Sequence, residues 1–330
     1  MVRFGIIGTN WITERFLQAG RTVEGFEAAA VCSRALERAE AYAAQHGVPH
    51  RFASVEDMAA SGTVDAVYIA SPNALHAEQA IRCLDLGLHV LCEKPLASNE
   101  FEAAAMIEAA KRNGALLMEA MKTTFLPNFE AIRDNLHRVG KVRRVNASYN
   151  QYSSRYDAYR AGTVLNAFDP TLSNGALMDL GVYCIYPIVR MFGAPKSVKA
   201  NGVMLESGVD GAGSLLLQYE GMEAVVAYSK ITHSTVPCEI QGEDGNLVFD
   251  KMSEPETVEW RNRRGEAETL TRPQSEHTMR YEIEAFMELV RRGATESPVN
   301  SHEVSLATIR IMDEARRQMG LVYPADRNRP

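Results

Sequence analysis

Residues 3–12 read RFGIIGTNWI, a short apolar run followed by a glycine turn and by the start of an amphipathic segment. In a parallel α/β sheet, such a turn places the N-terminus of the first helix where it can bind a dinucleotide pyrophosphate. The match to the pattern G-x-G-x-x-G is imperfect, because Asn10 stands at the second glycine and Thr13 at the third. Asn adopts left-handed backbone angles more readily than other residues with a side chain, so we expect Asn10 to preserve the turn. Taken alone, a glycine turn that binds no ligand explains this stretch equally well.

The alternation of apolar runs and amphipathic stretches continues to about residue 120. The predicted strands are 4–7, 27–32, 66–70, 89–91 and 116–118. The predicted helices are 10–23, 35–45, 74–86 and 99–113. Repeated strand–helix units build a doubly wound parallel sheet, so residues 1–120 predict an α/β Rossmann domain that binds a dinucleotide.

The pattern changes from about residue 141. Runs such as GSLLLQY (213–219), EAVVAYS (223–229) and NLVFD (246–250) follow one another with glycine-containing turns, which is typical of antiparallel strands. One helix interrupts them near 175–191, and two amphipathic helices close the chain near 277–292 and 303–319. Residues 121–330 therefore predict an α+β domain with a mostly antiparallel open sheet, and the last helices are free to pack back on the first domain.

Composition excludes several classes of function. A net charge of −7 over 330 residues argues against broad binding of nucleic acid or of an anionic membrane. The five cysteines form no C-x-x-C pair, which is typical of reduced thiols in a cytoplasmic protein. The apolar run at the N-terminus is too short for a signal peptide, and no apolar stretch approaches the roughly 20 residues of a transmembrane helix. We expect a cytoplasmic protein with no metal site.

The end of the second predicted strand indicates which nicotinamide cofactor binds. NAD-binding domains usually carry a carboxylate there, but this strand ends in Cys32-Ser33-Arg34. Arg34 can bind a ribose 2′-phosphate through its planar fork, and Ser33 can donate a further hydrogen bond. We therefore expect NADP(H) to be preferred over NAD(H) by about tenfold or more. The alternative is a solvated arginine at the start of an exposed helix.

The segment Ser71-Pro72-Asn73 follows another predicted strand. Loops at this edge of a doubly wound sheet lie over the ligand crevice, so the segment can turn the chain over a nicotinamide ribose. Asn73 is equally plausible as a helix N-cap. His76, on the helix that follows, is a cofactor-side candidate that could equally be a structural histidine.

Two further segments carry candidate acid–base chemistry. In Cys92-Glu93-Lys94-Pro95, a lysine follows an apolar strand and is followed at once by proline. In SNGALMDLGVYCIYP (173–187), Asp179 and Tyr183 stand at i and i+4, which places a carboxylate and a phenol on one helix face. A lysine, a carboxylate and a tyrosine that converge can move a proton to or from an alcohol oxygen. The alternative is a surface lysine and a helix face that packs on the sheet.

A group of tyrosines lies soon after the first strand of the second domain. Hydroxyl-bearing aromatic rings suit sugar rings, and Tyr and Arg are also enriched at oligomer interfaces, so both readings stay open. The members are Tyr149, Tyr152, Arg155, Tyr156 and Tyr159.

Together these segments resemble the Gfo/Idh/MocA family, named for glucose–fructose oxidoreductase, inositol dehydrogenase and a rhizopine-catabolism protein. The resemblance covers essentially the whole chain and rests on GIIGTNWI, VCSR, SPNALHAEQA, GLHVLCEKPLA, MEAM and GALMDLGVY, in that order. It implies redox chemistry on sugars, polyols or related alcohols, a substrate-binding second domain, and dimers or tetramers formed through the open sheet. Many members of the family have histidine at the position of Tyr183. A tyrosine there is similar to the branch of dihydrodiol dehydrogenase, xylose dehydrogenase and glucose–fructose oxidoreductase. That branch often has Trp and Arg where this chain has Lys122 and Thr124, positions that approach the substrate in the family. The resemblance therefore does not imply that this chain acts on the same substrates as that branch.

The resemblance implies an NADP(H)-dependent oxidoreductase that moves a hydride between nicotinamide and a carbinol or carbonyl carbon. The alternatives are a non-catalytic NADP-binding regulator and a redox-assisted glycosidase. The implied catalytic residues are Lys94, Asp179 and Tyr183, with either Lys94 or Tyr183 as the immediate proton carrier. The cofactor-binding candidates are Gly8, Thr9, Asn10, Trp11, Ile12, Ser33, Arg34, Ser71, Pro72, Asn73, His76, Glu93 and Lys94. The substrate-side candidates are Lys122, Thr124, Tyr152, Asp179 and Tyr183.

Overall fold

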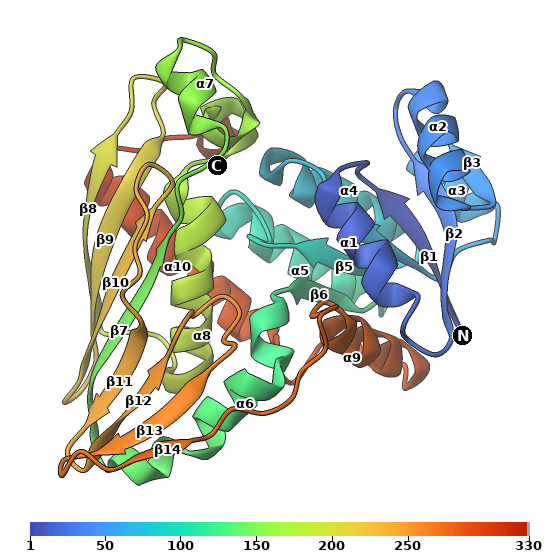
Figure 1. Ribbon diagram of the computed structural model, residues 1–330. Coiled ribbons are helices and arrows are strands. Elements are labelled where there is room, and N and C mark those ends of the chain that lie inside the picture. Colours follow the sequence, from blue (N-terminus) through green and yellow to red (C-terminus); the bar gives the residue numbers. More distant parts are fainter. Residues whose placement is uncertain (329–330) are drawn as a thin grey trace. The chain divides into compact units, whose positions relative to one another are not determined.

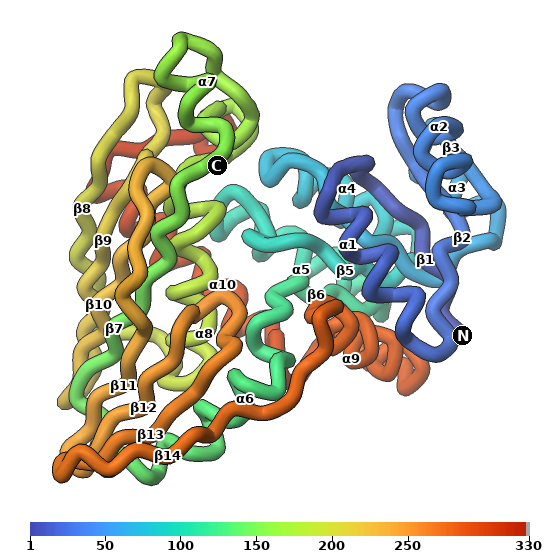
Figure 2. Tube along the Cα trace, in the orientation of Figure 1, coloured from blue at the N-terminus to red at the C-terminus, as the bar shows by residue number. Residues whose placement is uncertain are grey.

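The computed structural model describes residues 1–328, which form two compact units (Figures 1 and 2). The first unit contains Met1–Lys122 and Ser275–Ser305, and the second contains Thr123–Gln274 and the chain from Leu306 onward. The sequence predicts a boundary near residue 120, with the last helices free to pack back on the first domain. Of those helices, α9 (Arg280–Arg291) belongs to the first unit and nearly all of α10 (His302–Met319) to the second.

The first unit is built on a parallel sheet of six strands in the order β3-β2-β1-β4-β5-β6. The strands are β1 (Val2–Ile7), β2 (Phe26–Cys32), β3 (His50–Phe52), β4 (Ala66–Ile69), β5 (His89–Glu93) and β6 (Leu117–Ala120). The other helices of this unit are α1 (Trp11–Gly20), α2 (Leu36–His46), α3 (Val55–Ala60), α4 (His76–Asp85) and α5 (Glu100–Asn113). The strand order reverses between β1 and β4, and in such sheets ligands bind beyond the carboxyl ends of the strands at that point. The predicted Rossmann fold is confirmed, although β3 and α3 were not predicted.

Aromatic rings hold the N-terminal strand between its neighbours in this unit. Phe4 on β1 stacks on Phe26 of β2 at 5.1 Å and meets Phe286 of α9 at 5.7 Å. Phe16 of α1 stacks flat on Tyr68 of β4, with 3.7 Å between ring centroids. The helix α9 thus shares the core with β1 although some 280 residues separate them in sequence (Figure 2).

The second unit is built on a sheet of eight strands in the order β14-β13-β12-β11-β7-β10-β9-β8. The strands are β7 (Val142–Asn150), β8 (Ser197–Met204), β9 (Asp210–Gln218), β10 (Glu223–Ser229), β11 (Cys238–Gly242), β12 (Gly245–Phe249), β13 (Val258–Asn262) and β14 (Ala267–Thr269). All pairs are antiparallel except β7 with β10. The predicted mostly antiparallel sheet is therefore confirmed.

At the β8 edge, the Gln318 side chain near the end of α10 pairs with the strand backbone. Its amide nitrogen donates to Val198 O at 2.9 Å, and its oxygen accepts from Ala200 N at 2.8 Å. A side-chain amide thus occupies one donor and one acceptor that an edge strand otherwise leaves open.

The helix that carries Asp179 and Tyr183 is not a single α-helix as predicted for 175–191. It begins as a π-helical segment, Leu177–Gly181, and continues as α8 (Val182–Phe192), which lies against the sheet (Figure 1). A π-segment widens the helix locally and is common at functional sites.

By length and composition alone, the helical stretch Pro170–Phe192 is the one candidate membrane span among residues 1–328. The sequence predicts no such span, because none of its apolar runs approaches roughly 20 residues. The candidate arises where turns and two helix types join into one longer helical stretch. Since 72% of its apolar window is buried within the structure, the stretch has the character of a core helix.

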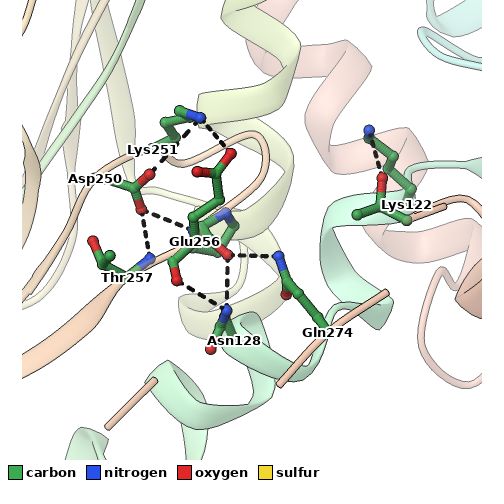
Figure 3. A network of polar contacts seen from close by, with 9 residues as sticks. Lys122, Asn128, Asp250, Lys251, Glu256, Thr257 and Gln274 are labelled. Carbon is green, nitrogen blue, oxygen red and sulfur yellow. Dashed lines mark hydrogen bonds and ion pairs between the residues drawn. The ribbon is translucent and has the colours of Figure 1, made fainter. Parts of the chain in front are cut away.

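The helix α6 (Pro127–Asp134) is fixed to the loop that follows β12 (Figure 3). Asn128 Nδ2 and Gln274 Nε2 both donate to Pro255 O, at 3.1 and 3.0 Å. Asn128 Oδ1 accepts from Arg272 N at 2.6 Å. One buried amide therefore satisfies backbone groups from two separate segments of the second unit.

Candidate active site

The turn between β1 and α1 is shaped by Gly8. Its φ is +109°, and a Cβ added there would lie 2.5 Å from Ala70 O at the end of β4. Only glycine fits this position, because a side chain would meet rigid backbone as well as an unfavourable φ. The turn from β1 and the end of β4 are therefore in close contact at the point where the strand order reverses.

Asn10 does not adopt the left-handed backbone that we expected. Its φ is −132° and its ψ 178°, and it is the N-cap of α1. Its Oδ1 accepts from Ile12 N at 3.0 Å and Thr13 N at 3.3 Å, and its Nδ2 donates to Ala70 O at 2.7 Å. The side chain thus caps the helix and ties it to β4, so Gly8 alone supplies the positive φ of the turn.

The carboxyl end of β2 carries Ser33 and Arg34, the residues expected to read the ribose. Ser33 N donates to Phe52 O at 3.1 Å, which fixes the chain beside β3, and Arg34 is exposed. An exposed guanidinium at the edge next to the Gly8 turn, with no carboxylate at the strand end, fits a nucleotide with a 2′-phosphate. Thr9, Trp11 and the cap residues lie at the first turn of α1, and the Trp11 side chain is exposed.

His76 bridges the two loops that follow β4 and β5. It is fully buried, and its ring nitrogens lie 2.9 Å from Ser71 O and 3.0 Å from Pro95 O. Burial lowers the pKa of this imidazole, so the neutral ring has one N–H to share between two carbonyl oxygens. The structure therefore gives His76 a role in holding the two loops together, while Pro72 and Asn73 lie in the loop after β4, where Pro72 precedes the 3₁₀ helix Asn73–Leu75.

The carboxyl end of β5 presents Glu93 and Lys94. The Glu93 carboxylate accepts from Tyr68 OH at 2.5 Å and from Lys94 N at 3.3 Å. Burial raises the pKa of Glu93, while the Lys94 charge acts to lower it. The peptide bond between Lys94 and Pro95 is cis. Glu93 thus points into the unit and supports the backbone of Lys94, and is not placed as an exposed cofactor ligand.

Two further buried carboxyl groups lie in the first unit and were missed by the sequence analysis. Glu119 on β6 accepts from Leu96 N at 2.9 Å, and burial raises its pKa to about 7. Burial also raises the pKa of Glu282 on α9 well above its usual value, and the Glu93 charge adds to this shift. An acidic residue inside an apolar stretch, as in Leu117–Ala120, is the sequence feature that could have indicated a buried carboxyl group.

In the second unit, Asp179 lies on the π-segment and Tyr183 on the first turn of α8. The Tyr183 ring meets Tyr149 of β7 edge to face, with 5.7 Å between centroids. Asp179 Oδ2 lies 2.8 Å from the ammonium of Lys230, which directly follows β10. Lys230 was not predicted, although it follows the apolar run EAVVAYS much as Lys94 follows HVLCE.

A fully buried carboxylate, Asp210 at the start of β9, caps the beginning of this helix. It accepts from Ala176 N at 3.1 Å and Leu177 N at 2.7 Å. Burial raises the pKa of Asp210 to about 6, and the Lys230 charge acts to lower it. Gly175 has φ +147°, and a Cβ there would lie 2.1 Å from Asp210 Oδ1. The close approach of this carboxylate therefore requires glycine before the helix.

Of the remaining substrate-side candidates, Lys122 and Thr124 share the short 3₁₀ helix Lys122–Phe125, at the boundary between the two units, while Tyr152 follows β7. Lys122 is in the first unit and donates to Thr278 Oγ1 at 3.1 Å (Figure 3), while Thr124 is buried in the second unit. Tyr152 is exposed, donates to Asp157 Oδ1 at 2.7 Å and meets Tyr156 edge to face. Lys94 belongs to the first unit and Asp179 and Tyr183 to the second, so their joint action on one proton stays a prediction.

Comparison with known proteins identifies the family. Residues 2–121 match the oxidoreductase family with an NAD-binding Rossmann fold, and residues 132–248 match the GFO/IDH/MocA C-terminal domain. The chain belongs to the Gfo/Idh/MocA oxidoreductase family. The predicted family and class of enzyme are thereby confirmed.

Three proteins that are similar to this chain in sequence or structure are oxidoreductases. It is 59% identical to scyllo-inositol 2-dehydrogenase (NADP(+)) IolU of Bacillus subtilis (strain 168), over 99% of both chains. It is 32% identical to trans-1,2-dihydrobenzene-1,2-diol dehydrogenase of Xenopus tropicalis, over 98% of this chain and 99% of the other. Among solved structures, the 3-ketoreductase KijD10 of Actinomadura kijaniata, in complex with NADP and TDP-benzene, is 27% identical with a TM-score of 0.83. That match covers 96% of this chain and 98% of the other.

Proposed function

We propose that this protein is an NADP(H)-dependent dehydrogenase that oxidises a ring-bearing polyol of the inositol type to the corresponding ketone, and reduces the ketone in the reverse direction. The observation that carries the proposal is the 59% identity, over 99% of both chains, to an NADP⁺-dependent scyllo-inositol 2-dehydrogenase. The broader class, an oxidoreductase acting on CH–OH groups of sugar-like substrates, follows from family membership.

The first unit supplies the cofactor site in this proposal. The Gly8 turn lies against the end of β4 and leaves no room for a side chain, so backbone groups can approach a pyrophosphate. Arg34 is exposed at the end of β2, where a guanidinium can bind a 2′-phosphate through two parallel hydrogen bonds. When bound, NADP(H) supplies or accepts the hydride.

The proton is handled by side chains of the chain itself. Tyr183 holds a phenol at the first turn of α8, where it can give or take the proton of the reacting alcohol. Lys94 follows β5 on a backbone that Glu93 supports. An ammonium placed beside a phenol favours the ionised form of that phenol, which is the role we propose for Lys94. Asp179, one turn before Tyr183, contributes a carboxylate on the same helical stretch.

The first test is the change in absorbance near 340 nm when purified protein is mixed with NADP⁺ and scyllo-inositol, myo-inositol, aldoses or a trans-dihydrodiol. We expect turnover with an inositol, and a loss of about a hundredfold or more in Tyr183→Phe and in Lys94→Ala. The matched control for Lys94→Ala is Lys111→Ala, which changes the same residue type at an exposed position. No turnover with any polyol, or full activity in either site variant, contradicts the corresponding part of the proposal.

The preference for NADP(H) has its own test. NADPH should bind about tenfold or more tightly than NADH, and Arg34→Ala should remove most of the difference by weakening NADPH alone. Arg38→Ala, on the exposed side of the helix that follows, is the matched control. Equal affinities for NADPH and NADH in the wild-type protein would contradict the assigned role of Arg34.

Two outcomes would favour the alternative functions. Tight NADPH binding without turnover of any alcohol would favour a regulator that binds the cofactor, and release of a free sugar from a glycoside would favour redox-assisted glycosidase chemistry. We also propose a cytoplasmic homodimer or homotetramer formed through the open sheet of the second unit, which analytical ultracentrifugation tests directly.

A further inference from the structure

Lys230 is a buried cation that the chemistry described so far leaves without a role. Its side chain is 4% exposed, and its ammonium lies 2.8 Å from Asp179 Oδ2. The ammonium also donates to Ala167 O at 3.1 Å and lies 5.5 Å from the centre of the Phe168 ring. A buried charge is costly unless it is paired and hydrogen-bonded, so this ammonium needs a carboxylate close by.

Two carboxylates are available in this part of the second unit, and they are used differently. Both carboxylate oxygens of Asp210 accept hydrogen bonds, one from Ala176 N and one from Leu177 N, so Asp210 caps the start of the helix. Asp179 is the carboxylate in direct contact with Lys230. The pair therefore joins a side chain of the candidate site to a cation that is anchored in the interior of the unit.

This contact limits what Asp179 can do. An opposite charge at hydrogen-bond distance favours the ionised carboxylate, and an ionised carboxylate only accepts hydrogen bonds. Such a group is a poor proton carrier near neutral pH, because its affinity for a proton is low. It can instead bind a hydroxyl group that keeps its hydrogen throughout the reaction.

We propose that Lys230 is a positioning residue that holds Asp179 as a fixed carboxylate, and that this carboxylate accepts a hydrogen bond from a second hydroxyl beside the reacting carbon of the substrate. The inference rests on the proposed function and assigns to Asp179 the hydroxyl beside the reacting carbon of the inositol-type substrate. A simple alcohol, or a polyol that lacks the neighbouring hydroxyl, leaves the carboxylate without this hydrogen bond and reacts poorly.

Several ionisable groups surround this segment and enter its pH dependence. They are Asp210 from β9, Tyr228 from β10, Tyr149 from β7, Tyr183 from α8 and Tyr323 from the C-terminal segment. Burial raises the pKa of Asp210 to about 6, and the charge of Lys230 acts to lower it. Removing that charge should make both aspartates easier to protonate, so activity should fall as pH decreases through the new range.

The test compares Lys230→Met with Lys230→Arg, in the wild-type and Asp179→Asn backgrounds. In Lys230→Met we expect kcat/KM for the vicinal diol to fall about tenfold or more, mainly through KM, with a new decline on the acidic side of the pH profile. Lys230→Arg keeps the charge and should restore most of the activity and the original profile. In the Asp179→Asn background, Lys230→Met should change kcat/KM by less than about twofold, because the partner is already gone. An unchanged pH profile and KM in Lys230→Met would overturn the proposal.

A second readout does not depend on turnover. In protein labelled with ¹³C at aspartate carboxyl groups, the signal that disappears in Asp179→Asn reports the titration of Asp179. Its midpoint in the wild-type protein should lie below the ordinary aspartate value of about 3.9, and it should rise in Lys230→Met. A wild-type midpoint above the ordinary value overturns the proposal, even if the Met variant does not fold.

The two proposals fail in different ways. If the wild-type protein turns over no alcohol with NADP⁺, the proposed dehydrogenase is wrong whatever Lys230 does. If the wild-type protein is active but oxidises a deoxy analogue without the neighbouring hydroxyl as fast as the diol, only the inference about Asp179 and Lys230 is wrong. NADPH affinity should stay within about twofold of wild type in all Lys230 variants, since the cofactor residues belong to the first unit.

Discussion

The buried carboxyl group of Glu119 makes the stability of the protein depend on pH in a direction opposite to that of most acidic residues. Glu119 is 2% exposed, its Oε1 accepts from Leu96 N, and a side-chain hydrogen bond with Ser305 acts to lower its pKa. Burial raises its pKa from 4.5 to about 7. The folded protein therefore binds this proton more tightly than the unfolded chain does, so the contribution of Glu119 to stability falls as pH rises through this range.

The magnitude follows from the same two values. The difference between 4.5 and about 7, at about 1.4 kcal/mol per pH unit, corresponds to about 3 kcal/mol of stability that is present below pH 4.5 and lost above pH 7. Glu119→Gln cannot ionise and lacks this dependence. Placing an amide nitrogen in this buried site costs about 1–3 kcal/mol at every pH without changing the slope.

The measurement is urea-induced unfolding of wild type and Glu119→Gln, followed by circular dichroism at several pH values between 5 and 8. The free energy of unfolding of the variant, minus that of wild type, should increase by about 2–3 kcal/mol over this interval. Ionisable groups that do not interact with Glu119 are common to both proteins and cancel in the difference, whereas Glu93, whose charge raises the pKa of Glu119, leaves a smaller residual dependence on pH. Glu108→Gln, at an exposed position, should give a difference that does not change with pH. A constant difference for Glu119→Gln would refute the reasoning.

Three other changes test close contacts and buried charges. Gly8→Ala should lower NADPH affinity about tenfold or more in a fluorescence titration, since the new Cβ meets backbone; Gly47→Ala, where φ is +66° and the space is open, should leave affinity unchanged. Gly175→Ala should displace the Asp210 carboxylate and lower the free energy of unfolding by about 2–4 kcal/mol in urea, and an effect below about 1 kcal/mol would contradict the assigned contact. Lys122→Met removes a charge that lowers the pKa of nearby buried carboxyl groups, so its midpoint of thermal unfolding should fall further below that of wild type at pH 8 than at pH 5; equal losses at both pH values would argue against this role.

The sequence predicted the features that depend on local pattern. The parallel strands of the first unit, the glycine turn at residue 8 and the serine and arginine after β2 all follow from apolar runs and the residues that end them. The structure confirms the fold, and the comparisons confirm the family. The strand β3 was missed because it has three residues and is largely exposed, so it carries little apolar signal.

What the sequence did not predict depends on contacts between distant residues. The hydrogen bond from Asn10 Nδ2 to Ala70 O joins residues sixty positions apart. Asp210 reaches the start of the helix at Ala176 from a different strand, and Lys230 reaches Asp179 from the end of a third segment. A polar residue inside or just after an apolar strand signals that a buried partner exists, but only the three-dimensional register identifies that partner.

The two edge strands of the eight-stranded sheet affect whether this protein can pair with strands of other molecules. At one end, the Gln318 amide already bonds to the backbone of β8, so an incoming strand would have to displace it before it could pair there. At the other end, β14 (Ala267–Thr269) is three exposed residues long and offers an incoming strand little to pair with. Open edges are the usual starting points for endless strand addition and fibre growth. Each edge of this sheet is protected from strand addition in a different way. At β8 a side-chain amide occupies the backbone hydrogen-bonding groups, and at β14 the strand is too short to pair stably.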